Sequence, residues 1–162
     1  MWSTHLMASV NLRRVSAAEP QGVHSIRPAP DQAHLVAGVE KSLAEVEADE
    51  ALTAFAVYDG SQRGLPQPER PPVGFAVIEV TAGVGFILRV LIDADHQRRG
   101  YGRALMRELV RRLSLSPDVE LIATSHRHDN AAMAGLCAEL GFERWSTPFA
   151  PAEGEIYLCL PA

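Results

Sequence analysis

The feature that most constrains this chain is a glycine-containing run, Gln-Arg-Arg-Gly-Tyr-Gly, at residues 97–102. It lies between an apolar stretch at residues 86–92 and an amphipathic stretch at residues 104–113. A chain that leaves a strand and enters a helix through glycines directs several backbone N–H groups at one point, where the helix dipole favours an anion. Gly100 and Gly102 also lack the Cβ atoms that would hinder a close approach. The run therefore predicts a phosphate-binding loop.

Composition limits the classes of protein to consider. The chain has 162 residues, of which 47% are hydrophobic and 22% charged, as expected for one soluble globular domain. Its net charge of −5 gives no general attraction to nucleic acid or to an anionic membrane, and no apolar run is long enough to span a bilayer. The cysteines, Cys137 and Cys159, show neither metal-ligand spacing nor a disulfide framework. We therefore expect a cytoplasmic protein without a metal.

Apolar periodicity and chain breakers divide the sequence into elements. Residues 1–23 are expected to form a poorly ordered or irregular extension, and residues 24–162 a single domain. Within that domain the pattern predicts strands at residues 24–27, 52–58, 73–80, 84–92, 119–124, 142–145 and 155–160. It predicts helices from residue 32, at 41–48, at 104–113 and from 129 or 130 to 140. The predicted order is β-α-α-β-β-β-α-β-α-β-β, with a proline-rich hairpin loop at residues 61–72.

Three motifs, at their spacing, resemble the GNAT superfamily of acetyl-CoA-dependent N-acetyltransferases. Val-Leu-Ile at residues 90–92 is followed, after four residues, by the glycine run. Asn130 begins a segment in which Met133, Leu136 and Cys137 recur at helical spacing, and Leu-Gly-Phe at 140–142 ends it. The resemblance covers residues 25–160 and implies an α/β fold with a mixed, mostly antiparallel sheet flanked by helices. It also implies that the sheet is splayed open beside the strand at residues 84–92.

The resemblance implies acetyl-CoA as the co-substrate and assigns residues to its binding. Backbone groups of the strand would pair with the pantetheine arm, one N–H would polarise the thioester carbonyl, and the loop amides would hold the pyrophosphate. Asn130 would contact the pantetheine side, although it suits equally well as a helix N-cap, and both roles can coexist. The implied cofactor residues are Val90, Leu91, Ile92, Gln97, Arg98, Arg99, Gly100, Tyr101, Gly102, Arg103 and Asn130.

A second, less specific resemblance concerns bacterial diamine and spermine/spermidine acetyltransferases. It rests on Arg27-Pro28, on residues 39–45 and on residues 154–156. Short strings of Leu, Ala and Glu also recur by chance in amphipathic helices. The acceptor is therefore expected to be a primary amine, either small and polyamine-like or the N-terminus or lysine of a protein or peptide. A catalytically weak CoA-binding regulatory module is a further alternative.

The catalytic groups are harder to assign than the cofactor loop. Converting an alkylammonium of pKa about 10.4 to the neutral amine at pH 7 costs ~4.6 kcal/mol. In polyamine-acetylating relatives an acidic residue often lies two positions before the pantetheine-binding segment, but this chain has Leu88 there, followed by Arg89. Glu79 and Glu155 are candidate bases, but a surface or substrate-binding carboxylate is the favoured interpretation of each.

The residue that reprotonates the leaving thiolate is also unusual. Many relatives have a tyrosine seven residues after the asparagine, and this chain has Cys137 there, which is either a general acid or a buried packing residue. Other candidate acids are Tyr58, Tyr101 and Tyr157. Histidines at 96, 126 and 128 lack a third ligand at metal-binding spacing and are expected in loops near the cofactor phosphates. A homodimer is possible through apolar groups near Phe149 and Ile156.

Overall fold

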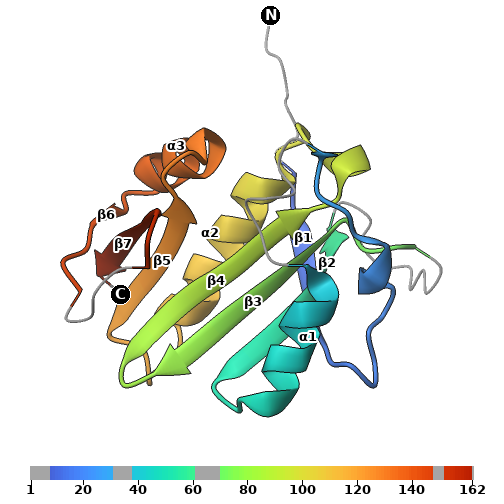
Figure 1. Ribbon diagram of the computed structural model, residues 1–162, viewed down its shortest axis with the longest axis horizontal. Helices are drawn as coiled ribbons and strands as arrows, with labels where there is room; N and C mark the ends of the chain where they lie inside the picture. The colour runs from blue at the N-terminus through green and yellow to red at the C-terminus, as the bar shows by residue number, and fades with distance from the viewer. Residues whose placement is uncertain (1–7, 31–37, 61–69, 148–151, 162) are drawn as a thin grey trace, which may run out of the picture.

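The computed structural model describes residues 8–30, 38–60, 70–147 and 152–161, and its centre is a seven-stranded sheet (Figure 1). The strand order is β1-β2-β3-β4-β5-β7-β6, and every described pairing is antiparallel except that of β4 with β5. The predicted α/β class and mixed, mostly antiparallel sheet are confirmed. The strands are Val10–Val15 (β1), Leu52–Asp59 (β2), Gly74–Thr81 (β3), Val84–Ile92 (β4), Leu121–Arg127 (β5), Glu143–Arg144 (β6) and Glu155–Pro161 (β7).

Helices cover both faces of the sheet (Figure 1). On one face, here called the α2–α3 face, the apolar sides of α2 and α3 pack on sheet residues such as Ile87. On the other, the α1 face, Leu43 of α1 packs with Phe75 and Leu91. The α-helices are Val39–Ala48 (α1), Tyr101–Ser114 (α2) and Ala131–Glu139 (α3), and two short 3-10 turns are Val23–Ser25 (η1) and Ala94–His96 (η3).

The first strand lies earlier in the chain than the sequence pattern predicts. Residues 24–27 do not form a strand, because Gly22, at φ +82°, leads into the turn η1. The strand is β1, within the segment expected to be irregular, and it pairs with β2 along its whole length. Arg13 and Arg14 obscured it, since they interrupt the apolar pattern. Both are exposed, and charged side chains are common on an edge strand.

The other described elements follow the predicted order, with boundaries displaced by a few residues. The meander of β2, β3 and β4 and the segments α1, α2, β5, α3, β6 and β7 are all present. Gly141, at φ +93°, follows α3 as the predicted C-terminal glycine. The helix expected from residue 32 and most of the loop predicted at residues 61–72 lie outside the described residues.

A β-bulge in β4 marks the point where that strand separates from β5. On the β3 side, Ile87 faces Ile78 and Arg89 faces Val77, so Leu88 has no partner. On the opposite side, β5 pairs with β4 only as far as Ile87. Because a bulge bends its strand and increases the local twist, the remainder of β4 diverges from β5. The sheet is therefore open beside β4, as predicted.

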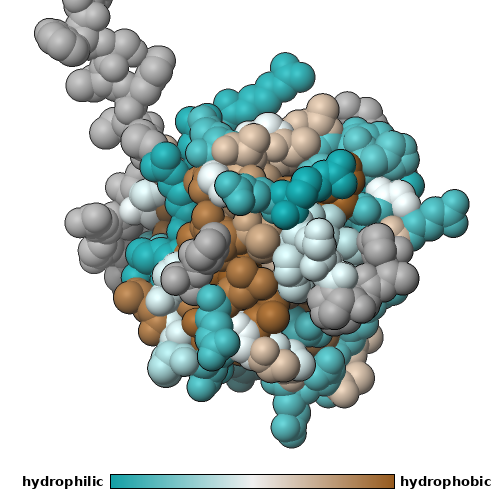
Figure 2. All heavy atoms as spheres, turned by 90° about the vertical axis from the view of Figure 1, so that its left-hand side faces the viewer, coloured by the Kyte–Doolittle hydropathy of each residue, from teal (hydrophilic) through white to brown (hydrophobic). Residues whose placement is uncertain are grey.

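The end of the sheet that carries β6 and β7 shows hydrophobic side chains in its middle and hydrophilic ones around them (Figure 2). Ile156, on β7, is partly buried and packs against the core of the α2–α3 face. Phe149 lies outside the described residues, so the homodimer stays a prediction. Among the described residues, no helix has the length and apolar character needed to cross a membrane.

Candidate active site

The N-terminus of α2 has free backbone donors. The first helical hydrogen bond runs from the amide of Ala104 to the carbonyl of Gly100, so the amides of residues 101–103 have no partner within the helix. No side chain in the described part of the protein caps this end. Gly100 and Arg98 have φ values of +85° and +63°, a left-handed geometry that turns successive N–H groups toward one side. The predicted loop thus has the geometry of an anion site.

Backbone groups of β4 face the gap in the sheet. The amide of Asp93 donates to Val73 of the preceding segment, at 2.8 Å, so the alternation of the ladder directs Leu91 toward β3 and Val90 and Ile92 toward the gap. β5 does not pair with this part of β4. The side chain of Gln97 donates to the carbonyl of Ile92 across 3.2 Å and joins the loop to the strand. Val90 therefore presents strand-like hydrogen-bonding groups to a ligand.

Asn130 begins α3 on the opposite side of the gap. Its Oδ1 accepts a hydrogen bond from the amide of Met133 at 3.1 Å, which is N-cap geometry. The same residue lines the cavity described below. Since the cap uses the oxygen of the side-chain amide, its NH₂ group is available as a donor. Both predicted roles are therefore geometrically compatible.

One cavity of about 410 Å³ joins these three features. It extends from the N-terminus of α2 along the open edge of β4 to the first turns of α3. Nine of the eleven predicted cofactor residues line it. They are Val90, Leu91, Ile92, Gln97, Arg98, Gly100, Tyr101, Gly102 and Asn130, and the other lining residues are Pro28, His96, Ala132, Met133 and Leu136. The sequence pattern missed Pro28 as a lining residue, whereas it placed His96 near the cofactor phosphates.

The two remaining predicted residues lie beside the cavity. Arg99 is exposed and does not line it. The guanidinium of Arg103 forms an ion pair with Glu139 at 2.9 Å, which joins the first turn of α2 to the end of α3. The side chain of Arg103 is thus occupied by Glu139, whereas its backbone amide is one of the free donors at the start of α2. Only the backbone of Arg103 suits the predicted pyrophosphate contact.

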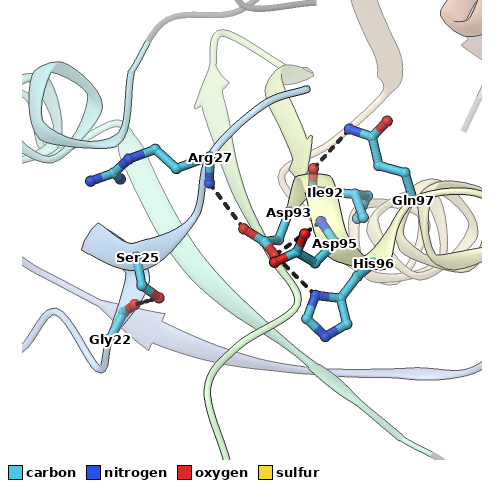
Figure 3. Close-up of polar contacts among 8 residues, drawn as sticks. All are labelled: Gly22, Ser25, Arg27, Ile92, Asp93, Asp95, His96 and Gln97. Carbon is cyan, nitrogen blue, oxygen red and sulfur yellow. Dashed lines mark hydrogen bonds and ion pairs between the residues drawn. The ribbon is translucent and has the colours of Figure 1, made fainter. Parts of the chain in front are cut away.

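Asp93 holds the loop to an earlier segment of the chain (Figure 3). Its carboxylate accepts hydrogen bonds from the amides of Arg27 and Asp95, at 3.1 and 3.3 Å, and lies 3.0 Å from Nδ1 of His96. The amide of Ala94 returns a bond of 2.8 Å to the carbonyl of Arg27. Because these partners use both carboxylate oxygens, Asp93 fixes the entry to the loop and the orientation of the His96 ring.

Tyr101 connects the loop to the end of β2. Its ring lines the cavity and its hydroxyl donates to Oδ2 of Asp59 across 3.0 Å. Burial, reinforced by the hydrogen bond to Asp59 and by its charge, raises the pKa of Tyr101 above the ordinary value of 10.0. The phenol therefore stays protonated and directed at Asp59, which counts against its alternative role as the acid for the thiolate.

Cys137 lies in the core and does not line the cavity. It is fully buried between α3 and the sheet, and burial raises the pKa of its thiol to about 11. A neutral, enclosed thiol is a packing group and a poor proton donor. This placement favours the packing interpretation over the catalytic one.

The candidate bases and Arg89 belong to the α1 face. Glu79 is opposite Phe86 in the β3–β4 ladder and does not line the cavity. Arg89, aimed by the bulge, forms an ion pair with Glu45 of α1 at 2.7 Å. Glu155 begins β7, next to the core residue Ile156, and alternation places it on the α1 face.

The histidines at positions 96, 126 and 128 lie in different parts of the structure. His96 lines the cavity. His126 was expected in a loop but lies within β5, where it is buried and has Nδ1 2.8 Å from the carbonyl of Arg127. His128 is near the carbonyl of Gly154, at 3.3 Å. Among the described residues, no group of three or more His, Cys, Asp or Glu side chains could hold a metal ion.

Comparison with known proteins supports the interpretation of this geometry. A curated relative, the ribosomal protein bS18-alanine N-acetyltransferase of Escherichia coli K12, is 24% identical over 131 residues, which are 81% of each chain. The crystal structure of an acetyltransferase from Thermus thermophilus has a TM-score of 0.72 at 18% identity and covers 95% of this chain and 97% of its own. That of the Campylobacter jejuni N-acetyltransferase PseH with acetyl coenzyme A has a TM-score of 0.64 at 14% identity, covering 94% and 98%.

The family model described as "Acetyltransferase (GNAT) family" matches residues 16–142, which include the loop, the open edge of β4 and all of α3. The match covers more than half of the chain. The chain belongs to the GNAT family and is an acyltransferase.

Proposed function

We propose that this protein transfers the acetyl group of acetyl-CoA directly to a primary amine. The observation that carries the proposal is the cavity that joins the uncapped N-terminus of α2 to the unpaired edge of β4. Its two ends suit the two chemically different parts of CoA: amides for phosphate and an open strand edge for the amide groups of pantetheine. The solved PseH structure, which contains acetyl coenzyme A, supports this choice of donor by its fold.

The cavity passes a simple test for this co-substrate. Apart from its chain neighbours and the backbone of its own helix, a Cβ atom built on Gly102 meets no atom of the described residues within 4 Å, so the space beside that backbone is open. Arg98, which has a charged side chain, also lines this end of the cavity. Open space beside free amides is what a close approach by a phosphate requires.

The chain's own groups divide the reaction between binding, polarisation and proton removal. Bound acetyl-CoA supplies an activated thioester, and the N–H of Val90 would polarise its carbonyl. The neutral amine attacks the carbonyl carbon, a C–N bond forms, the C–S bond breaks and CoA leaves as a thiolate. The proton lost by the amine passes to water or to a carboxylate of the α1 face, where Glu79 and Glu155 lie. The thiolate takes its proton from solvent, since Cys137 is enclosed.

The test combines donor binding with turnover. We expect isothermal titration calorimetry to give a micromolar dissociation constant for acetyl-CoA. Acetyl-CoA consumption should increase with one class of acceptor in a panel of amino acids, polyamines, aminoglycosides and peptides with free N-termini. Binding without turnover on any amine would indicate a regulatory CoA-binding module, and absence of binding would refute the assignment of the cavity.

The sequence predicts one domain at residues 24–162; because β1 pairs with β2, the domain that we propose also includes β1, and its proposed location is cytoplasmic. The two cysteines are free, as suits a reducing compartment. A peptide N-terminus is the main alternative acceptor, because the curated relative acts on an alanine of ribosomal protein bS18.

A further inference from the structure

The gap beside β4 lets donor and acceptor approach from opposite faces of the sheet. The cavity lies mainly on the α2–α3 face, since α2 and α3 with their caps Gly100 and Asn130 supply seven of its fourteen lining residues, and Val90 and Ile92, which pack against the core of that face, supply two more. In the part of the chain that the structure describes, no strand pairs with this edge of β4 beyond Ile87. An acceptor that approaches from the α1 face therefore reaches the strand at Val90 without displacing a ligand from the cavity.

Arg89 is the charged residue that the bulge places at this opening. It precedes Val90 in sequence, and the bulge puts both Leu88 and Arg89 on the α1 face, where Glu45 and Leu91 also lie. Only 19% of the Arg89 side chain is exposed. An acceptor nitrogen that attacks near Val90 would thus lie close to a residue whose guanidinium side chain is mostly buried.

This guanidinium has unused hydrogen-bonding capacity. Nη1 lies 2.7 Å from Oε2 of Glu45, yet Nη1 is buried and makes no hydrogen bond of acceptable geometry. Among the described residues Glu45 is the only acid paired with Arg89. A guanidinium carries five N–H donors in a planar fork that matches a carboxylate, so one oxygen of Glu45 leaves most of them unused. Nη1 itself is buried, so a second carboxylate would have to bind the part of the Arg89 side chain that stays exposed.

Apolar surface lies beside Arg89. The rings of Phe86 and Tyr157 meet edge to face on the α1 face with centroids 6.1 Å apart, over the small residue Ala123 of β5. Leu88 follows Phe86 on the same side of β4. These groups suit an apolar substituent on the acceptor.

On these observations, which rest on the proposed function, we propose that the acceptor is an amino acid with an apolar side chain, and that Arg89 binds its α-carboxylate. In an α-amino acid the carboxylate is two bonds from the nitrogen, so a cation next to the attack site can bind it. A diamine would instead bring a second ammonium toward Arg89. The ammonium of the amino acid is attracted by the carboxylates of the α1 face, Glu45 and Glu79.

The test compares phenylalanine with phenylalaninamide, which keeps the amine and the ring but replaces the carboxylate with a neutral amide. We expect kcat/KM to be at least tenfold higher for phenylalanine. In Arg89→Met this preference should fall below twofold, through KM for phenylalanine, while the KM for acetyl-CoA stays unchanged. Arg107→Met is the matched control, because Arg107 is exposed on α2, and it should keep the full preference.

A purely structural role for the Arg89–Glu45 ion pair predicts a different result. In that case Arg89→Met lowers activity toward both acceptors equally, and the proposal is wrong. The double variant Glu45→Gln/Arg89→Met removes both charges of the ion pair, so it leaves no unpaired charge that would disturb folding. It should still lack the preference for phenylalanine. Equal use of both acceptors by the wild type, or a preference for a polyamine or a peptide N-terminus, would overturn the proposal while leaving the acetyltransferase function intact. Failure to bind acetyl-CoA would instead overturn both.

Discussion

At the scale of a single residue, the glycine at position 102 is expected to matter for acetyl-CoA binding and not for the stability of the fold. Outside its own helix, a Cβ at this position meets no described residue within 4 Å, and alanine is favoured over glycine inside a helix by about 0.5–1 kcal/mol. Gly102→Ala should therefore raise the melting temperature slightly but lower acetyl-CoA affinity at least tenfold in calorimetry. Gly135→Ala is the control, because Gly135 also has open space but lies outside the cavity lining. Unchanged affinity in Gly102→Ala would remove the loop from the binding site.

The buried thiol of Cys137 should make the free energy of unfolding depend on pH. Its folded pKa of about 11 lies above the ordinary 9.0, so the folded protein holds this proton more tightly than the unfolded chain does. The stabilisation is present below pH 9 and is lost as the pH rises through 11, on the order of 2–3 kcal/mol. The free energy of unfolding should fall over this range, and fall less in Cys137→Ala. That variant should cost about 1–2 kcal/mol near pH 7 and lower turnover less than tenfold.

Among the elements, α3 depends on Asn130 for its start and offers a way to separate two roles. Aspartate caps a helix as well as asparagine does but has no NH₂ group to donate. Asn130→Asp should therefore keep the thermal stability of the wild type while KM for acetyl-CoA rises several-fold. Asn130→Ala should lose both, with a cost in stability of about 1 kcal/mol. If Asn130→Asp binds acetyl-CoA normally, the residue is only a cap.

The elements also show which parts of the site a sequence can predict. The loop, the start of α2 and Asn130 are local signals, and the structure gathers their residues around one cavity. The bulge at Leu88 and the ion pair between Arg89 and Glu45 depend on how separate segments meet. The same holds for the hydrogen bond from Tyr101 to Asp59, residues 42 positions apart. No local period encodes such contacts, so they appear only with the fold.

For the molecule as a whole, the question is whether the stable domain includes β1. The family model starts at residue 16, but β1 pairs with β2 from Val10 to Val15 and buries Val15 in the core of the α1 face. Removing residues 1–15 exposes the edge of β2, and the melting temperature should fall by about 5 °C or more. Arg14→Ala, which changes only an exposed side chain of β1, should leave it within about a degree. An unchanged melting temperature in the truncated chain would show that β1 is dispensable.

The parting of β4 from β5 after Ile87 has a kinetic consequence for the proposed transferase. Two substrates that enter from opposite faces of the sheet use separate access routes. The acetyl-CoA or its product therefore need not leave before the amine binds. Initial-rate plots should therefore intersect, as for a ternary complex, and desulfo-CoA should compete with acetyl-CoA but act as a noncompetitive inhibitor toward the amine. Parallel lines would instead require an acetylated enzyme, for which the enclosed thiol of Cys137 offers no accessible nucleophile. The opening between β4 and β5 thus allows both substrates to be bound at the same time.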